Sequence, residues 1–438
     1  MFSTSTKLSI ARAILTKRSP YYVQFYIVGR CNLMCRQCNI VETNSRIGEM
    51  TLDQIKDTAR SLKKAGVGIV LLTGGEPFLR DDLPQIVEEF CRLGMNVRLQ
   101  TAGTKVATED KLRACYEAGA RDINVSLDSL DHPTFDYINA VPGSSVNAIN
   151  TIERISQVFR GKSAILSLGT VMSQFNYREI PSIVEFARQI GWFVSLVPVH
   201  ISPPSKVKGF RSFDSNFNFR QEQWPELERA CDELIALKRA GAPLFDSERF
   251  LRSSIEFLKG RPPTWRHNGL CDSPNLYFAI RPNGDFTTCC DYTLDSAPKV
   301  YDADFAQRYK SGELEKRRDV QDIVKNCSGC HYGSYPEVTL SVRDPKALLE
   351  RVRLVLLSGK GKLAEAPARS DFLGVVERVK GQYPLVYPKT WMDAELAKNI
   401  DDWQKTERRK NLLKADQLAR KAQGRLRGAG PDVLIGPE

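Results

Sequence analysis

The stretch Cys31-Asn-Leu-Met-Cys35-Arg-Gln-Cys38 places three cysteines within eight residues, at the spacing C-x3-C-x2-C. Three thiolates this close together can bind three corners of a four-iron cluster, which normally takes four cysteine ligands. One iron is then left open to a small molecule. The alternatives are three reduced thiols, or a zinc site without its fourth ligand, although zinc sites usually pair C-x2-4-C with a distant second pair.

Around this stretch, β-type apolar runs alternate with amphipathic helical patterns. We expect strands at residues 21–28, 68–72, 96–100, 122–127, 164–171 and 192–199, and helices at residues 51–65, 83–93, 111–118, 146–159 and 180–190. Strands and helices that alternate at this spacing predict an α/β fold with a parallel sheet. Six such units are too few for a closed eight-stranded barrel.

Polar motifs follow several of these strands. Gly74-Gly75-Glu76-Pro77 follows the second strand, Ser126-Leu127-Asp128 the fourth, and Asn176 the fifth. Glycines allow a close approach of the backbone to a ligand, and Glu76 offers a carboxylate. Because active sites of parallel α/β folds lie at the carboxyl ends of strands, we expect these groups to meet the cysteine loop there. A helix cap is the alternative role for Asp128.

The cysteine spacing and the Gly-Gly-Glu-Pro motif one helix later together resemble the radical S-adenosylmethionine (SAM) superfamily. The resemblance implies a partial (β/α)6 TIM-like barrel, here residues 21–215, with SAM at the open iron of a [4Fe-4S] cluster. The implied cluster ligands are Cys31, Cys35 and Cys38. The implied SAM-binding residues are Gly74, Gly75 and Glu76 at the methionine amino group, Ser126 and Asp128 at the ribose, and Asn176 at the carboxylate or ribose region.

Two positions depart from the family pattern. Gln37 stands where an aromatic residue near the adenine is usual, and Ala102 stands where an Asn is usual. We therefore assign Ala102 no role beyond shape. The adenine contacts are instead expected from the backbone at Cys38 and Asn39, or from an apolar residue such as Val197.

A second set of cysteines lies beyond two expected connector helices in residues 216–268. It surrounds a β-hairpin whose predicted turn is Pro282-Asn283-Gly284-Asp285. The set resembles the twitch form of the SPASM auxiliary-cluster domain, here residues 269–345. The resemblance implies a second [4Fe-4S] cluster on Cys271, Cys289, Cys327 and Cys330, with Cys290 as a substitute for Cys289. A structural zinc ribbon is the alternative.

Composition narrows the class of protein further. The chain has 438 residues, a formal net charge of +11 and no apolar run long enough to cross a membrane. Its odd number of cysteines, eleven, and their clustering fit metal ligation in a reducing compartment, so we expect a cytoplasmic protein. Cys91, Cys115 and Cys231 fall within helical patterns as ordinary apolar residues. The basic charge is spread out and no nucleic-acid motif accompanies it, so we expect a solvated surface and no nucleic-acid partner.

Both ends of the chain are basic. Residues 1–20 contain no acid and predict an amphipathic helix that packs on the barrel; a transit peptide or a peripheral membrane contact are the alternatives. Residues 346–438 predict a basic helical extension, with a helix at about 344–357 and another at 394–427. The second helix packs on the core by default, or it dimerises or binds an acidic partner.

The resemblance implies reductive cleavage of SAM to a 5′-deoxyadenosyl radical that abstracts hydrogen from a substrate C–H bond. With an auxiliary cluster to accept an electron, we expect a net oxidation. The alternatives are radical bond formation on a lipid, peptide or metabolite, and a metal-binding scaffold without catalysis. The implied electron donor is of the flavodoxin or ferredoxin type. No catalytic base is identified, although arginines and tyrosines at residues 200–220 are candidates.

Overall fold

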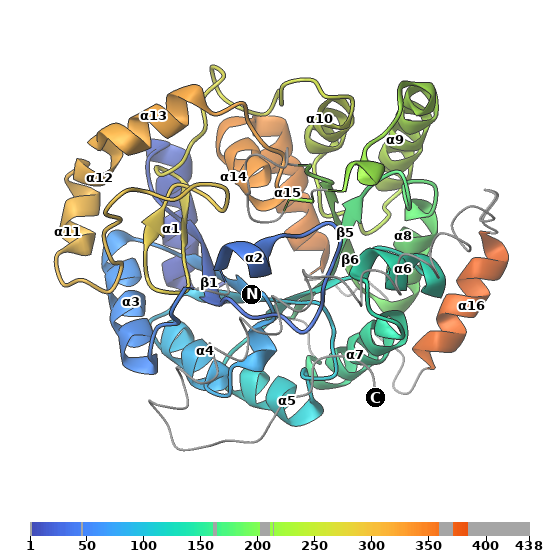
Figure 1. Cartoon of the computed structure of the whole chain (residues 1–438), viewed down its shortest axis with the longest axis horizontal. Helices are drawn as coiled ribbons and strands as arrows, with labels where there is room; N and C mark the ends of the chain where they lie inside the picture. Colours follow the sequence, from blue (N-terminus) through green and yellow to red (C-terminus); the bar gives the residue numbers. More distant parts are fainter. Residues whose placement is uncertain are drawn as a thin grey trace.

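Six parallel strands curl into an open barrel with helices around its outside (Figure 1). The computed structural model describes residues 2–44, 47–160, 164–201, 211–212, 214–358 and 371–383. The strands are β1 (Tyr22–Val28), β2 (Ile69–Gly74), β3 (Asn96–Thr101), β4 (Asp122–Ser126), β5 (Ile165–Met172) and β6 (Phe193–Pro198). The outer helices are α3 (Leu52–Ala65), α4 (Leu83–Arg92), α5 (Glu109–Glu117), α7 (Ser144–Val158) and α8 (Ile180–Ile190). The predicted partial (β/α)6 barrel is confirmed.

The strands separate an apolar outer face from a more polar inner face. Outward residues such as Phe25, Leu99 and Val125 are fully buried against the helices. On the inner face, Gln24 and Gln100 are only half-buried. Since successive side chains of a strand point to opposite faces, this alternation sets which residues line the barrel.

The second hairpin belongs to the same sheet as the barrel. Strand β7 (Tyr277–Ile280) pairs in parallel with β1, and β8 (Phe286–Thr287) pairs with β7 in the antiparallel sense. The sequence predicted the hairpin but not this pairing. Its consequence is that the second cysteine set lies next to the strand that leads into Cys31. Three short helices follow the hairpin: α11 (Phe305–Lys310), α12 (Glu313–Lys316) and α13 (Arg318–Asn326).

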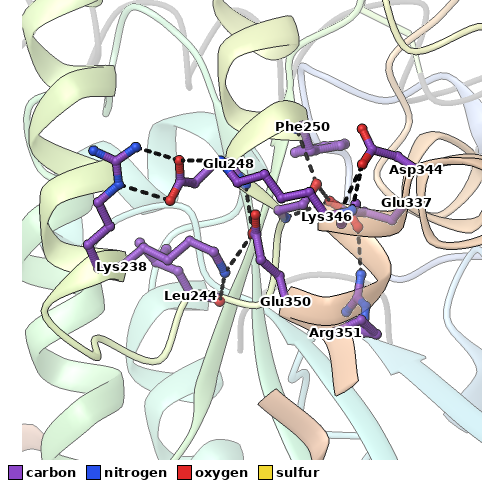
Figure 2. A network of polar contacts seen from close by, with 12 residues as sticks. Lys238, Leu244, Glu248, Phe250, Glu337, Asp344, Lys346, Glu350 and Arg351 are labelled. Carbon is purple, nitrogen blue, oxygen red and sulfur yellow. Dashed lines mark hydrogen bonds and ion pairs between the residues drawn. The ribbon is translucent and has the colours of Figure 1, made fainter. Parts of the chain in front are cut away.

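Two helix pairs close the side of the barrel beyond β6. They are α9 (Trp224–Arg239) with α10 (Glu248–Leu258), and α14 (Ser334–Arg343) with α15 (Pro345–Ser358). Figure 2 shows the polar network that joins them. Glu337 accepts hydrogen bonds from the amide of Ser247 at 2.7 Å and from Arg351 at 2.7 Å, and Glu350 accepts one from the amide of Glu248 at 3.0 Å. The first turn of α10 is thereby tied to both later helices.

The N-terminal helix α1 (Thr4–Thr16) packs on the barrel as predicted, through both polar and apolar contacts. Thr6 Oγ1 donates to the carbonyl of Gly68 at 2.9 Å, and Ser9 Oγ donates to that of Gly66 at 2.6 Å. Leu8 and Leu15 instead remain 66% and 82% exposed. These hydroxyls satisfy carbonyls just before β2, while Ala13, Ile10 and Ile14 pack in an apolar cluster with Val338 and Val342 of α14.

The remaining described elements are short or lie at the periphery. They are α2 (Ile40–Asn44), α6 (His132–Asn139), α16 (Phe372–Gln382) and the 3-10 turns η1 (Pro77–Leu79), η2 (Ser215–Phe217) and η3 (Gln221–Gln223). The expected helix at 394–427 and about half of the 200–220 loop lie outside the described residues. Among the described helices, none is long and apolar enough to span a membrane.

Candidate active site

The three cysteines of the loop after β1 converge at the mouth of the barrel. Burial raises the pKa of both Cys31 and Cys35 above the usual thiol range, and Cys38 contributes to both shifts. The amide of Cys38 donates to the carbonyl of Cys35 at 3.1 Å. Cys35 also donates to Asn139 Oδ1 at 3.0 Å. Within the described part of the chain, no group of three or more His, Cys, Asp or Glu side chains is arranged to hold a metal ion.

Gly74 and Gly75 bring the end of β2 into backbone contact with the cysteine loop. The amide of Gly75 donates to the carbonyl of Val28 at 3.1 Å, and that of Glu76 donates to the carbonyl of Arg30 at 2.9 Å. A Cβ atom on Gly75 would lie 1.9 Å from the Arg30 carbonyl oxygen, and one on Gly74 would lie 2.2 Å from that of Val28. Both positions therefore require glycine.

Glu76 is fully buried beside the loop, and its carboxylate is held by neighbours on β3. Oε2 accepts hydrogen bonds from Thr101 Oγ1 and from the amide of Ala102, each at 2.9 Å. Burial raises the pKa of Glu76 to about 6, against the lowering effect of these donors and of the Phe78 amide. Its negative charge in turn contributes to the raised pKa of Cys31, so the carboxylate lies on the Cys31 side of the site.

Asp128 faces the opposite side of the cysteine loop. Its charge contributes to the raised pKa of Cys35, while its own pKa is raised to about 6 by burial. Oδ1 accepts from the Val171 amide, and Oδ2 accepts from Nε2 of Gln37, both at 2.7 Å. The loop is thus anchored to β2 through the Glu76 backbone and to the end of β4 through Asp128.

Asn176 and Ser126 occupy different environments near Asp128. Asn176 Nδ2 donates to the carbonyls of Asp128 at 2.7 Å and Val171 at 2.9 Å, and its Oδ1 accepts from the Ser173 amide. In this structure Asn176 therefore fastens the β4 and β5 loops together, and its direct contact with SAM stays a prediction. Ser126 pairs with Gly169 in the β4–β5 ladder and is half-buried, and its hydroxyl forms no hydrogen bond with the described residues.

Known proteins share both the sequence and the fold of this chain. The Radical SAM superfamily profile matches residues 25–187. The AdoMet-dependent heme synthase of Methanosarcina barkeri is 31% identical over 331 residues, which cover 73% of this chain and 90% of that protein.

The chain belongs to the radical SAM superfamily.

More distant members match over shorter stretches or in fold alone. A GTP 3′,8-cyclase of Marinobacter nauticus is 32% identical over 184 residues, covering 39% of this chain but only 52% of that protein. The crystal structure of Streptococcus suis SuiB superposes with a TM-score of 0.51 at 17% identity, covering 72% of each chain. The superfamily uses a [4Fe-4S] cluster and SAM. The convergent thiols and the two-glycine contact give this radical SAM protein a donor set that fits them.

The second cysteine set also comes together. Burial raises the pKa of Cys271 to about 12, with contributions from the charges of Cys289 and Cys327. Burial also raises the pKa of Cys330, with contributions from the charges of Asp291, Cys289 and Cys271. These four thiols therefore occupy one region of the radical SAM protein, although they come from distant segments. Cys290 lies beside Cys289 and forms part of the small apolar cluster of Tyr26, Ile40 and Ala279, which Cys38 also contacts.

A short segment after β6 joins the two cysteine sets. Arg211 Nε donates to Asp291 Oδ2 at 3.0 Å, and Tyr332 donates to Oδ1 of the same carboxylate at 2.9 Å. The side chain of Asp291 is 3% exposed. On the other side, Asn39 donates to the carbonyl of Arg211, and Ser212 donates to that of Arg36. Arg211 and Ser212 thus connect the cluster loop with the residues around Cys290 and Cys330.

The sequence analysis did not identify the residues that hold the predicted site residues in place. Thr101 could have been predicted, because it is the last residue of β3 and the carboxyl ends of the strands meet at the site. The roles of Gln37 and Arg211 depend on tertiary contacts with Asp128 and Asp291. The cysteines at 91, 115 and 231 pack against the apolar core, as predicted.

Proposed function

We propose that this chain is an oxidative radical SAM enzyme with two [4Fe-4S] clusters. The observation that supports it best is the seating of Gly75 and Glu76 against the cysteine loop, which puts a buried carboxylate beside Cys31. A cation next to the open iron, such as the ammonium group of SAM, would complement that carboxylate. A scaffold that only stores metal would have no use for this arrangement.

The proposed residue roles follow the two sides of the loop. Cys31, Cys35 and Cys38 hold the first cluster, and Gly74 and Gly75 allow SAM to approach it closely. Glu76 binds the amino group of SAM. Ser126 and Asp128 lie toward the nucleoside, with Asn176 as a further predicted contact. When bound, the reduced cluster supplies one electron to SAM, giving methionine and a 5′-deoxyadenosyl radical that takes hydrogen from the substrate.

The second cysteine set makes a net oxidation the favoured outcome. After hydrogen abstraction, a substrate radical must lose one electron and one proton to become a closed-shell product. Cys271, Cys289, Cys327 and Cys330 would hold a second cluster that could accept this electron, and the external carrier would be of the flavodoxin or ferredoxin type. The proposed domain limits are residues 21–215 for the barrel and 269–345 for the auxiliary region.

The heme synthase relative suggests the first substrate to assay. Its match covers 90% of that protein, so a porphyrin-type heme precursor is the primary candidate. The half-buried Gln24 and Gln100 on the inner face of the barrel would accommodate polar groups of such a molecule. Radical bond formation on a lipid, peptide or other metabolite is the alternative, and the mass of the product distinguishes it from an oxidation.

The test is anaerobic reconstitution followed by iron and sulfide analysis and an assay of SAM cleavage. We expect about eight irons per chain, as two four-iron clusters require, and release of 5′-deoxyadenosine. Glu76→Gln should keep the iron but cleave SAM much more slowly. Absence of deoxyadenosine would overturn the radical function. About four irons would overturn the second cluster only.

A further inference from the structure

Gln37 carries a buried acceptor that the protein leaves without a partner. Its Nε2 donates to Asp128 Oδ2 at 2.7 Å, while its Oε1 is buried and has no hydrogen-bond partner among the described residues. The orientation of the amide follows from chemistry: turning it would place a carbonyl oxygen against a carboxylate oxygen. Since buried acceptors are nearly always satisfied, and an orphan costs about 1–3 kcal/mol, a donor from outside the described chain is expected here.

The position of Gln37 narrows the source of that donor. It lies in the cluster loop directly before Cys38, and its amide is bonded to the carboxylate of Asp128. The other carboxylate, Glu76, lies by the start of the loop, because its amide donates to the carbonyl of Arg30 at 2.9 Å. If the ammonium group of SAM binds at Glu76, its adenosine part extends toward Asp128 and Gln37. Adenosine offers two kinds of donor, the ribose hydroxyls and the 6-amino group of the purine.

We propose that Gln37 is a SAM-binding residue, whose Oε1 accepts a hydrogen bond from the adenosine part of SAM while its Nε2 orients Asp128. This inference rests on the proposed function and adds a residue to its cofactor site. A polar side chain then binds SAM from the position where the superfamily pattern has an aromatic residue. The Gln37–Asp128 bond also presets the site, because it fixes the acceptor before the ligand arrives.

The primary test measures SAM binding rather than turnover. The reconstituted protein and its Gln37→Met variant are titrated with SAM by equilibrium dialysis, and the reduced cluster is followed by EPR as SAM is added. Methionine keeps the length and removes both polar atoms. We expect SAM to bind about tenfold more weakly to the variant, as loss of one buried hydrogen bond predicts, with unchanged iron content. Gln307→Met, an exposed position on α11, is the matched control and should bind SAM normally.

Two SAM analogues then identify the donor. One lacks the purine 6-amino group, and the other lacks the ribose hydroxyls. The analogue that lacks the true donor should bind equally to wild type and Gln37→Met, whereas the other analogue should still show the tenfold difference. If both analogues and SAM bind the variant as well as wild type, the acceptor is satisfied by water and the proposal is wrong. If wild type binds no SAM at all, the proposed function fails instead.

A second variant distinguishes the proposed role of Gln37 from a folding defect. Gln37→Glu keeps the length and one acceptor but sets a second carboxyl group against Asp128. We expect it to weaken SAM binding more than Gln37→Met does, and Gln37→Glu combined with Asp128→Asn to recover part of the loss. No recovery in the double variant, with normal iron content, would contradict the coupled role of the two side chains.

Discussion

The cluster loop takes its three cysteines from eight consecutive residues, whereas the second set gathers its four from the segments around Cys271, Cys289 and Cys327–Cys330. The first set lies at the end of β1 and is anchored to β2 and to the end of β4. The second depends on β7 pairing with β1 and on Cys327, directly after α13, lying near Cys271. A local site keeps its geometry through a few backbone contacts, while an assembled site depends on the whole packing around it.

The two sets also differ in how their nearby carboxylates are held. At the barrel mouth, Glu76 and Asp128 are buried without a cationic partner in the described structure, and both have raised pKa values. Near the second set, Asp291 is paired with Arg211. The first arrangement leaves carboxylates able to respond to a ligand. The second serves to fix loops against one another, so the two halves should respond differently to substitution.

The largest expected effect comes from removing one ligand of each set. Cys35→Ala should abolish SAM cleavage and leave about four irons on the second set, because two cysteines alone do not retain the first cluster. Cys327→Ala should also leave about four irons but still cleave SAM, without completing substrate oxidation. Iron analysis and deoxyadenosine assays check both. Loss of all iron in either variant would show that the sets do not form independently.

The next effect tests the backbone contact that is specific to the cluster loop. Gly75→Ala would force a methyl group into the Arg30 carbonyl, so we expect a loss of about 3 kcal/mol or more in unfolding free energy and little iron in the first site. Gly48→Ala is the control, since a Cβ there meets nothing within 4 Å. Denaturant unfolding measures both variants. Similar stabilities would mean that the loop moves freely away from β2.

Breaking the Arg211–Asp291 ion pair, which connects the two cysteine sets, should lower the unfolding free energy by about 3 kcal/mol. Arg211→Met leaves the Asp291 carboxylate buried without its cation, which is the expensive way to disrupt an ion pair. The double variant Arg211→Met with Asp291→Asn should recover much of that stability. Thermal unfolding of wild type, the two single variants and the double variant gives the coupling energy between Arg211 and Asp291. A coupling near zero would remove Arg211 from the link between the two sets.

A buried carboxyl group of the barrel, Glu179, should make the stability of the protein depend on pH. Glu179 is buried and accepts from Ser129 and from the amides of Leu130 and Asp131, and burial raises its pKa from 4.5 to about 7. Because the folded state then holds the proton more tightly than the unfolded state, stability falls as pH rises between these values. From pH 5 to pH 7 wild type should lose about 2 kcal/mol relative to Glu179→Gln. Parallel stability curves for the two proteins would contradict this.

The smallest effect should distinguish the two adjacent cysteines of the second set. Cys290→Ser keeps a small polar group beside Tyr26, so iron content and stability should change little, by less than about 1 kcal/mol. Cys289→Ser should lose the second cluster. The opposite result would exchange the assignments of Cys289 and Cys290, and iron analysis of the two variants decides it.

Much of the first site was predictable from the sequence because it is made of short-range patterns. The spacing of Cys31, Cys35 and Cys38, the strand periodicity and the position of Gly75 each depend on neighbours along the chain. The helix ends were predictable for the same reason: Thr51 caps α3 with Gln54, and Gly66 ends it in the left-handed region. At α1 the sequence predicted the packed helix, but the hydrogen bonds of Thr6 and Ser9 to the carbonyls of Gly68 and Gly66 depend on the fold.

The sequence alone therefore determined the fold class, the place of the cluster loop and the identity of the second cysteine set. The folded chain decided that β7 joins β1, that Gln37 binds Asp128 and that Arg211 connects the two sets. Local patterns predict covalent spacing and periodicity, because these depend on backbone geometry over a few residues. Contacts between distant segments depend on how the whole sheet curls, and no single stretch of sequence carries that information.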